Sequence, residues 1–170
     1  MIAHLFAHIS QKHRGFIRMG TLTLPCAIGK SGIVSGKREG DGGTPRALLR
    51  PMMIYFRPDQ FRRHRFALPA KAITRTMGWC DDPRSPRYNR EIPLPSAHSH
   101  EKLWRDDGLY DIVVETDWNR RPAISGRGSA IFIHLARPGF KPTEGCIAFD
   151  RKGMKLFLSH LHKTMRIRIH

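Results

Sequence analysis

Acidic residues, cysteines and long apolar runs are all scarce in this sequence. Of its 170 residues only 14 are Asp or Glu, against 30 Lys or Arg, which gives a formal net charge of +16. Such an excess of positive charge indicates anionic partners and carries no information about the fold. We therefore expect a nucleic acid, an anionic membrane surface or an anionic cell-wall polymer among the partners of this chain.

The apolar runs are too short for a membrane-spanning helix, which needs roughly 20 apolar residues. We therefore predict no transmembrane segment. The opening residues, MIAHLFAH, are also too short and too polar for the apolar core of a secretory signal peptide, and basic residues follow at once. The sequence thus predicts no signal peptide, which leaves a cytoplasmic location open.

The three cysteines, Cys26, Cys80 and Cys146, lie far apart in the sequence and show no Cys-x-x-Cys spacing. This argues against a zinc site. An odd count fits one working thiol beside either two inert thiols or a Cys26–Cys80 disulfide. Of these two arrangements we expect two buried free thiols.

The stretch 131–149 carries the strongest chemical pattern. The apolar run IFIHL at 131–135 delivers His134, a Pro- and Gly-containing loop follows, and EGCIAF at 144–149 presents Cys146 directly after Gly145. We expect His134 and Cys146 on adjacent strands, with a ring nitrogen within about 4 Å of the sulfur. A nearby imidazole raises the thiolate fraction and transfers the proton. Gly145 leaves room for a substrate carbonyl to approach backbone N–H groups that would hold an oxyanion.

The same residues also fit a structural role. Free cysteine is among the most buried residue types, and a histidine between Ile133 and Leu135 fits a hydrogen-bonded core position. The pair alone therefore does not decide between catalysis and packing.

The motif around Cys146 resembles the active-site pattern of the YkuD-type L,D-transpeptidases. That pattern is His-Gly, a spacer, then Ser/Thr-His-Gly-Cys, followed by an apolar residue and often Arg. The matching residues are Thr143, Gly145, Cys146 and Ile147, with His134 upstream. The chain departs from the pattern in a shorter spacer and at Leu135, Glu144 and Ala148, which replace the Gly, the second His and the Arg. It is most similar to a branch of the family with a Thr-x-Gly-Cys motif.

The resemblance implies a role for each site residue. Cys146 would be the nucleophile and His134 the general base, the backbone carbonyl of Leu135 would orient the imidazole, and the Gly145 backbone would form the oxyanion hole. The implied enzyme is a peptidoglycan L,D-transpeptidase that cross-links stem peptides through a cysteine thioester. No metal or organic cofactor is implied, and the implied location is the periplasm or cell envelope.

Two alternative functions remain open at this stage. With water as acceptor, the same site would be an L,D-carboxypeptidase, a cysteine peptidase. A basic nucleic-acid-binding β domain, from a different class, fits the charge, although the sequence matches neither the ribonucleoprotein nor the KH pattern. We expect peptidoglycan stem peptides and an anionic cell-wall polymer as partners and no specific nucleic acid.

Glu144 is the departure closest to the nucleophile. Residues two apart in an extended segment point to the same face, and an ionised carboxylate beside Cys146 would raise the pKa of the thiol. We therefore predict that Glu144 pairs with Arg137 or Lys141, or faces solvent, and takes no part in proton transfer.

The remaining patterns predict a mostly β fold of about eight short strands with one C-terminal helix, in a single domain over residues 1–170. Asp150 is a favourable helix N-cap, and Met154, Phe157, Leu158 and Leu161 form one apolar stripe. The stretch GDGGTP at 40–45 resembles a segment that precedes a strand in YkuD-type domains, which implies a β-sandwich or barrel-type fold. Residues 57–105 read as a long irregular segment whose aromatic residues either line a groove or pack inside it.

Overall fold

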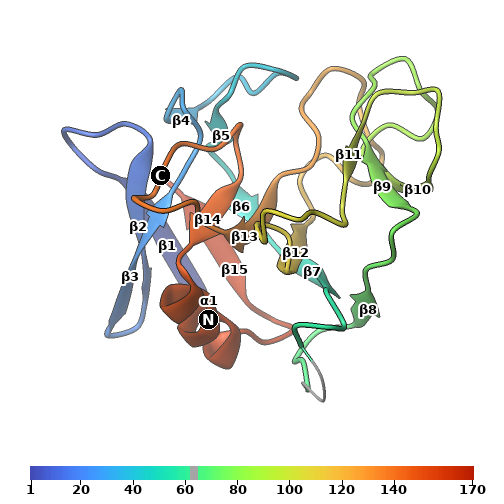
Figure 1. Ribbon diagram of the computed structural model, residues 1–170. Coiled ribbons are helices and arrows are strands. Elements are labelled where there is room, and N and C mark those ends of the chain that lie inside the picture. The colour runs from blue at the N-terminus through green and yellow to red at the C-terminus, as the bar shows by residue number, and fades with distance from the viewer. Residues whose placement is uncertain (62–64) are drawn as a thin grey trace.

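A strongly curled sheet of ten strands forms a half-barrel in the computed structural model, which describes residues 1–61 and 65–170 (Figure 1). In their order across the sheet the strands are β6 (Leu48–Leu49), β15 (Arg166–Ile169), β1 (Ile2–Ala7), β2 (Arg14–Met19), β3 (Leu22–Ala27), β14 (Ile147–Phe149), β13 (Phe132–Leu135), β12 (Ile112–Thr116), β7 (Pro51–Phe56) and β8 (Ala70–Ala72). Three neighbouring pairs, β1–β15, β13–β14 and β7–β8, are parallel. The predicted mostly β fold with one C-terminal helix is confirmed.

Two smaller sheets lie beside the half-barrel. One joins β10 (Arg90–Pro93), β9 (Met77–Cys80) and β11 (His100–Lys102), and the other pairs β4 (Ile33–Val34) with β5 (Thr44–Pro45). The expectation that 57–105 is irregular was therefore wrong for β8 to β11. The estimate of about eight strands was also too low, because elements of two to four residues are too short to show an alternating pattern.

The helix α1 (Arg151–His160) begins where the sequence predicts. The Asp150 side chain accepts a hydrogen bond from the Gly153 N–H at 2.6 Å, which satisfies one of the N–H groups left free in the first helical turn. Met154, Phe157 and Leu161 are buried against the half-barrel. The described part of the chain has no helix that is long and apolar enough to cross a membrane.

The core is divided into two clusters by the central strands of the sheet. One cluster lies inside the half-barrel and includes Ile133, Leu135 and the apolar face of α1. The other lies between the central strands and the β10–β9–β11 sheet, and includes Trp79, Phe132 and Cys146. All of β13 is buried because both of its faces are covered, which accounts for its continuous apolar run.

Candidate active site

A pocket of about 250 Å³ brings together residues from four parts of the chain: the segment 101–110, strand β13, the loop before β14, and β14 itself. Its lining residues are Glu101, Arg105, Leu109, Tyr110, His134, Arg137, Lys141, Pro142, Thr143, Glu144, Cys146 and Ala148. His134 and Cys146 thus share one pocket. Glu101, Arg105 and Tyr110 come from a region that the sequence did not assign to the site.

Strand register explains why His134 and Cys146 meet. In the parallel pair β13–β14, Ile133 lies opposite Ile147 and His134 opposite Ala148. Cys146 immediately precedes β14, two residues from Ala148, and side chains two apart along a strand share a face. The two functional side chains therefore point to the same side of the sheet from adjacent segments.

The Cys146 thiol is buried and held by backbone groups just before and at the start of β13. Its Sγ donates to the Ala130 carbonyl at 3.0 Å and accepts from the Phe132 N–H at 3.4 Å. Within the described residues, no hydrogen bond joins the Sγ to the His134 ring. Burial raises the pKa of the Cys146 thiol to about 12, and the nearby charge of Glu101 acts in the same direction. The Cys146 side chain is therefore a neutral thiol at pH 7.

His134 is also buried, and its ring is fixed from two directions. Nδ1 lies 2.8 Å from the Leu135 carbonyl oxygen, so Nδ1–H is the donor and Nε2 keeps its lone pair. The Tyr110 ring packs edge-on against the imidazole, with 5.2 Å between centroids. Burial lowers the pKa of His134 to about 4, despite the Leu135 hydrogen bond, which raises it. The imidazole is thus neutral at pH 7 and able to accept a proton.

Gly145 occupies a position that no other residue can take without strain. Its φ of +134° lies in the region that favours glycine, and a Cβ there would lie 2.7 Å from the Gly43 carbonyl oxygen. The Thr143 hydroxyl donates to the Cys146 carbonyl at 2.6 Å, and the Gly145 N–H donates to the same hydroxyl at 3.2 Å. The Thr143 hydroxyl therefore holds the backbone of both Gly145 and Cys146.

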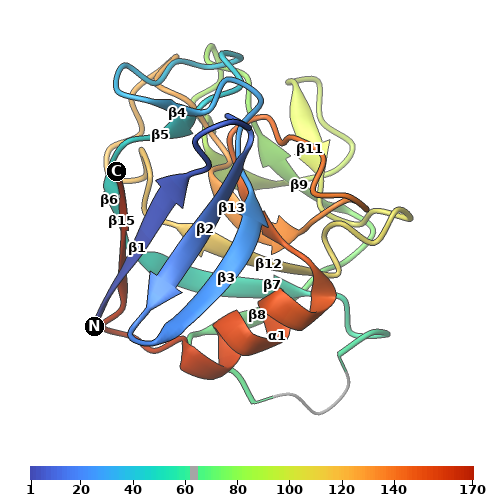
Figure 2. The same cartoon turned by 90° about the vertical axis from the view of Figure 1, so that its left-hand side faces the viewer.

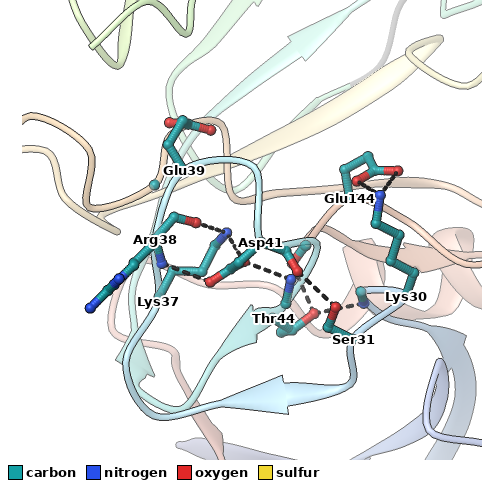
Figure 3. A network of polar contacts seen from close by, with 12 residues as sticks. Lys30, Ser31, Lys37, Arg38, Glu39, Asp41, Thr44 and Glu144 are labelled. Carbon is teal, nitrogen blue, oxygen red and sulfur yellow. Dashed lines mark hydrogen bonds and ion pairs between the residues drawn. The ribbon is translucent and has the colours of Figure 1, made fainter.

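The Gly-rich loop at 40–45 packs directly behind this backbone. The Thr44 hydroxyl donates to the Gly145 carbonyl at 2.9 Å and accepts from the Gly29 N–H at 2.9 Å. Inside the loop, the buried Lys37 ammonium contacts Asp41 Oδ1 at 2.5 Å (Figure 3), and Asp41 also accepts from the Gly43 N–H at 2.8 Å. The sequence linked this loop to the fold alone, whereas the structure shows that it supports Gly145.

Asn89 supports the segment that binds the Cys146 thiol. Its Oδ1 accepts from the Trp79 indole N–H and from the Ala130 N–H, both at 3.0 Å, and Ala130 in turn provides the carbonyl that binds the Cys146 thiol. Trp79 is fully buried and packs edge-on against Phe132. The aromatic residue Trp79 is thus interior packing, while Tyr110 lines the pocket.

Glu144 faces solvent and forms an ion pair, as predicted, but its partner is neither of the two predicted loop cations. Its carboxylate lies 2.7 Å from the Lys30 ammonium, and the two side chains are 73% and 52% exposed (Figure 3). Lys30 lies far upstream, and the loop 136–146 is brought to it by the bridge between Gly29 and Thr143.

We expect Glu144→Gln to have little effect. An exposed ion pair contributes about 0–1 kcal/mol, so the thermal unfolding midpoint should change by at most about 3 °C. The pH profile of Cys146 alkylation, followed by mass spectrometry, should be unchanged. A loss of His134-dependent alkylation in a folded Glu144→Gln protein would instead place Glu144 in the catalytic group.

The remaining charges of the pocket are mostly positive. Arg105 forms a two-pronged ion pair with Asp107, at 2.9 and 2.5 Å, whereas Arg137 and Lys141 form no ion pair within the described residues. The Glu101 carboxylate accepts from the Tyr110 hydroxyl at 2.5 Å, and burial raises the pKa of Glu101. The pocket therefore favours a ligand that carries a carboxylate.

The neutral thiol predicts a particular pH dependence for alkylation. Because the pKa of Cys146 is raised, the thiolate fraction is very small at pH 7, and it grows about tenfold for each pH unit below that pKa. The rate of iodoacetamide labelling should rise steadily from pH 7 to about pH 10 without a plateau. Cys26 and Cys80 are 1% and 0% exposed and, unlike Cys146, do not line this pocket, so they should label only after unfolding. A folded Cys146→Ala protein should therefore show no labelling. A plateau between about pH 6 and 9 would indicate a thiolate–imidazolium pair instead.

Comparison with known protein families found a match over almost the whole chain. Residues 3–169 match the YkuD model, described as the L,D-transpeptidase catalytic domain, and this family acts in general terms in cross-linking cell-wall peptidoglycan. Comparisons with curated proteins and with solved structures gave no significant match. Because the matched residues cover almost the whole chain, including His134 and Cys146, the chain belongs to the YkuD family of L,D-transpeptidase catalytic domains.

Proposed function

We propose that this chain is a peptidoglycan L,D-transpeptidase with Cys146 as nucleophile and His134 as general base. The observation that carries the proposal is that both side chains line one pocket, with the Nδ1 of His134 bound to the Leu135 carbonyl. This hydrogen bond directs the basic Nε2 away from the backbone. A hydrogen-bonded core histidine and an inert thiol would have no need to share a pocket.

In the first half-reaction, Cys146 Sγ attacks the carbonyl carbon between residues three and four of a donor stem peptide. Its proton passes to His134 Nε2, and the Gly145 N–H turns from the long Thr143 contact toward the developing oxyanion. The C–N bond then breaks. The imidazolium returns the proton to the departing D-alanine amine, and a thioester remains on Cys146.

In the second half-reaction, the amine of an acceptor stem attacks the thioester and loses its proton through His134. This releases a three-to-three cross-link and restores the thiol. With water as acceptor the product is a tripeptide stem, which is the L,D-carboxypeptidase alternative. The neutral imidazole serves either acceptor, so mass spectrometry of the products is needed to separate them.

The pocket charges suggest how the donor stem is held. Arg137 and Lys141 line the same pocket as Cys146, and neither is neutralised by an ion pair within the described residues. We assign to them the free carboxylate of the terminal D-alanine, which lies next to the bond that breaks. Two cations close to a partly buried carboxylate provide charge-assisted hydrogen bonds.

Several finer assignments follow from the same proposal. Residues 1–170 act as a single catalytic domain in the periplasm or cell envelope, with peptidoglycan stems and an anionic cell-wall polymer as partners. We assign the chain to a branch of the family with a Thr-x-Gly-Cys motif, and in this chain Glu144 stands in place of the second histidine. The Thr143 hydroxyl, bound to the Cys146 carbonyl at 2.6 Å, supports the nucleophile in that branch.

The decisive experiment is intact-protein mass spectrometry after incubation with a carbapenem, a β-lactam class that acylates the family's nucleophile. We expect one adduct with the mass of the carbapenem, located on the peptide that contains Cys146. Incubation with a disaccharide-tetrapeptide should then yield either a cross-linked dimer or a tripeptide. If folded protein formed neither a carbapenem adduct nor a product from the disaccharide-tetrapeptide, that result would contradict the proposal.

A further inference from the structure

The outer side of the half-barrel carries a distinct group of side chains on β1, β2, β6 and β15. We call it the outer face and define it by residues that alternate with buried core positions: Ile2, His4, Phe6, Phe16, Arg18, Leu48, Arg166, Arg168 and His170. Figure 2 shows β1 and β2 facing the viewer, with β15 and β6 along their left edge. None of these residues lines the Cys146 pocket.

The strand register arranges the outer face in rows. Arg166 lies opposite Ile2 in the first row, and Phe6 opposite Phe16 in the third. The second row consists of Leu48, Arg168, His4 and Arg18, each opposite the next. Residues directly opposite each other share a face, so apolar and cationic side chains alternate across four neighbouring strands.

Apolar groups are unusually exposed on this face. Ile2 is 45% exposed, Phe16 37% and Leu48 44%. The described residues include six exposed large apolar side chains, and these three are half of them. The rings next to them form a stacked row, with His170 4.4 Å from Phe6 between centroids. Single exposed apolar residues are ordinary, but a group on adjacent strands marks an interaction surface.

Every charged residue on the outer face is an arginine. The sequence has no Asp or Glu before Glu39 and none after Asp150. In the described part of the chain, Arg18, Arg166 and Arg168 form no ion pair. Arg18 instead lies over the Phe6 ring, 5.8 Å from its centroid. This surface therefore has a positive charge that no Asp or Glu side chain of the described residues neutralises.

We propose that the outer face binds the surface of an anionic phospholipid bilayer. Exposed aliphatic and aromatic groups insert at the boundary between headgroups and acyl chains, and arginines among them contact lipid phosphates. A single-stranded nucleic acid would use the rings and arginines but would leave Ile2 and Leu48 in water. Proteins also bind single-stranded nucleic acids in grooves, whereas the outer side of a curled sheet is convex. Binding through the outer face would hold the Cys146 pocket close to the membrane. The proposal of membrane binding does not depend on the proposed reaction.

The test is co-sedimentation of the whole chain with vesicles. We expect binding to phosphatidylcholine vesicles that contain about 30 mol% phosphatidylglycerol and at least about tenfold weaker binding to pure phosphatidylcholine. Binding should weaken between about 50 and 500 mM salt without disappearing, because salt screens the arginines but not the apolar contacts. No sedimentation with anionic vesicles at low salt would overturn the proposal.

Two pairs of variants locate the surface. Arg18→Glu with Arg168→Glu should weaken binding at least about tenfold. The control Arg87→Glu with Lys102→Glu changes the net charge equally at exposed sites elsewhere and should weaken vesicle binding less than about threefold.

The second pair tests the apolar contacts. Leu48→Ser should weaken vesicle binding about threefold, whereas Ile124→Ser, at a side chain that is 48% exposed, should leave vesicle binding unchanged. Equal effects within each pair would overturn the assignment.

A labelled single-stranded DNA separates the two classes of partner. Membrane binding predicts that Leu48→Ser lowers vesicle binding and that the DNA competes poorly with vesicles. Tight DNA binding that is lost in the Arg18→Glu, Arg168→Glu protein but unaffected by Leu48→Ser would contradict the proposal and favour a nucleic acid.

Discussion

Cys146→Ala is expected to abolish the carbapenem adduct and to lower turnover of a tetrapeptide stem at least about a thousandfold, since loss of a nucleophile removes the covalent route. The fold should survive, because the thiol is small and its partners are backbone groups of Ala130 and Phe132. Loss of the thiol hydrogen bond costs about 1 kcal/mol, so the unfolding midpoint should fall by only a few degrees.

The matched control is Cys26→Ala. Cys26 is also a buried free thiol, but it belongs to the core cluster inside the half-barrel, and burial raises its pKa far above the ordinary range. Cys26→Ala should therefore keep the adduct and the turnover. If both variants lost activity equally, or if Cys146→Ala kept the adduct, Cys146 would not be the nucleophile.

Gly145→Ala is expected to destabilise the protein by about 2–6 kcal/mol and to lower turnover at least about a hundredfold. The backbone strain of φ +134° contributes about 1–3 kcal/mol. The contact of 2.7 Å between the new Cβ and the Gly43 carbonyl adds an overpacking cost of similar size. Relief of the contact moves either Gly43 or the Gly145 peptide, and the latter displaces the proposed oxyanion donor.

The control for this variant is Gly20→Ala, in the turn between β2 and β3. Gly20 also has a positive φ, of +60°, but a Cβ there would have no neighbour within 4 Å. It should cost about 1 kcal/mol and leave turnover unchanged. Thermal unfolding and turnover should be measured on both proteins. A Gly145→Ala protein as stable and active as Gly20→Ala would show that Gly43 does not fix the nucleophile loop.

Local patterns were sufficient for the parts of this protein whose structure depends on neighbouring residues. The helix after Asp150 was predictable because its N-cap and apolar stripe lie within one short segment. That His134 and Cys146 line one pocket was predictable because only a short loop separates them, and the motif around Cys146 indicated the family.

The supports of the site depended on contacts between distant segments. Thr44 binds the Gly145 carbonyl, Asn89 positions Ala130, and Lys30 pairs with Glu144. Nothing near any of these residues in the sequence indicates its partner, because the order of strands in the sheet, rather than residue spacing, brings the segments together. The sequence by itself therefore determined the family, the proximity of His134 to Cys146, and the terminal helix. Only the tertiary structure decided which side chains support His134 and Cys146, how burial shifts their pKa values, and that the arginines of β2 and β15 share one face.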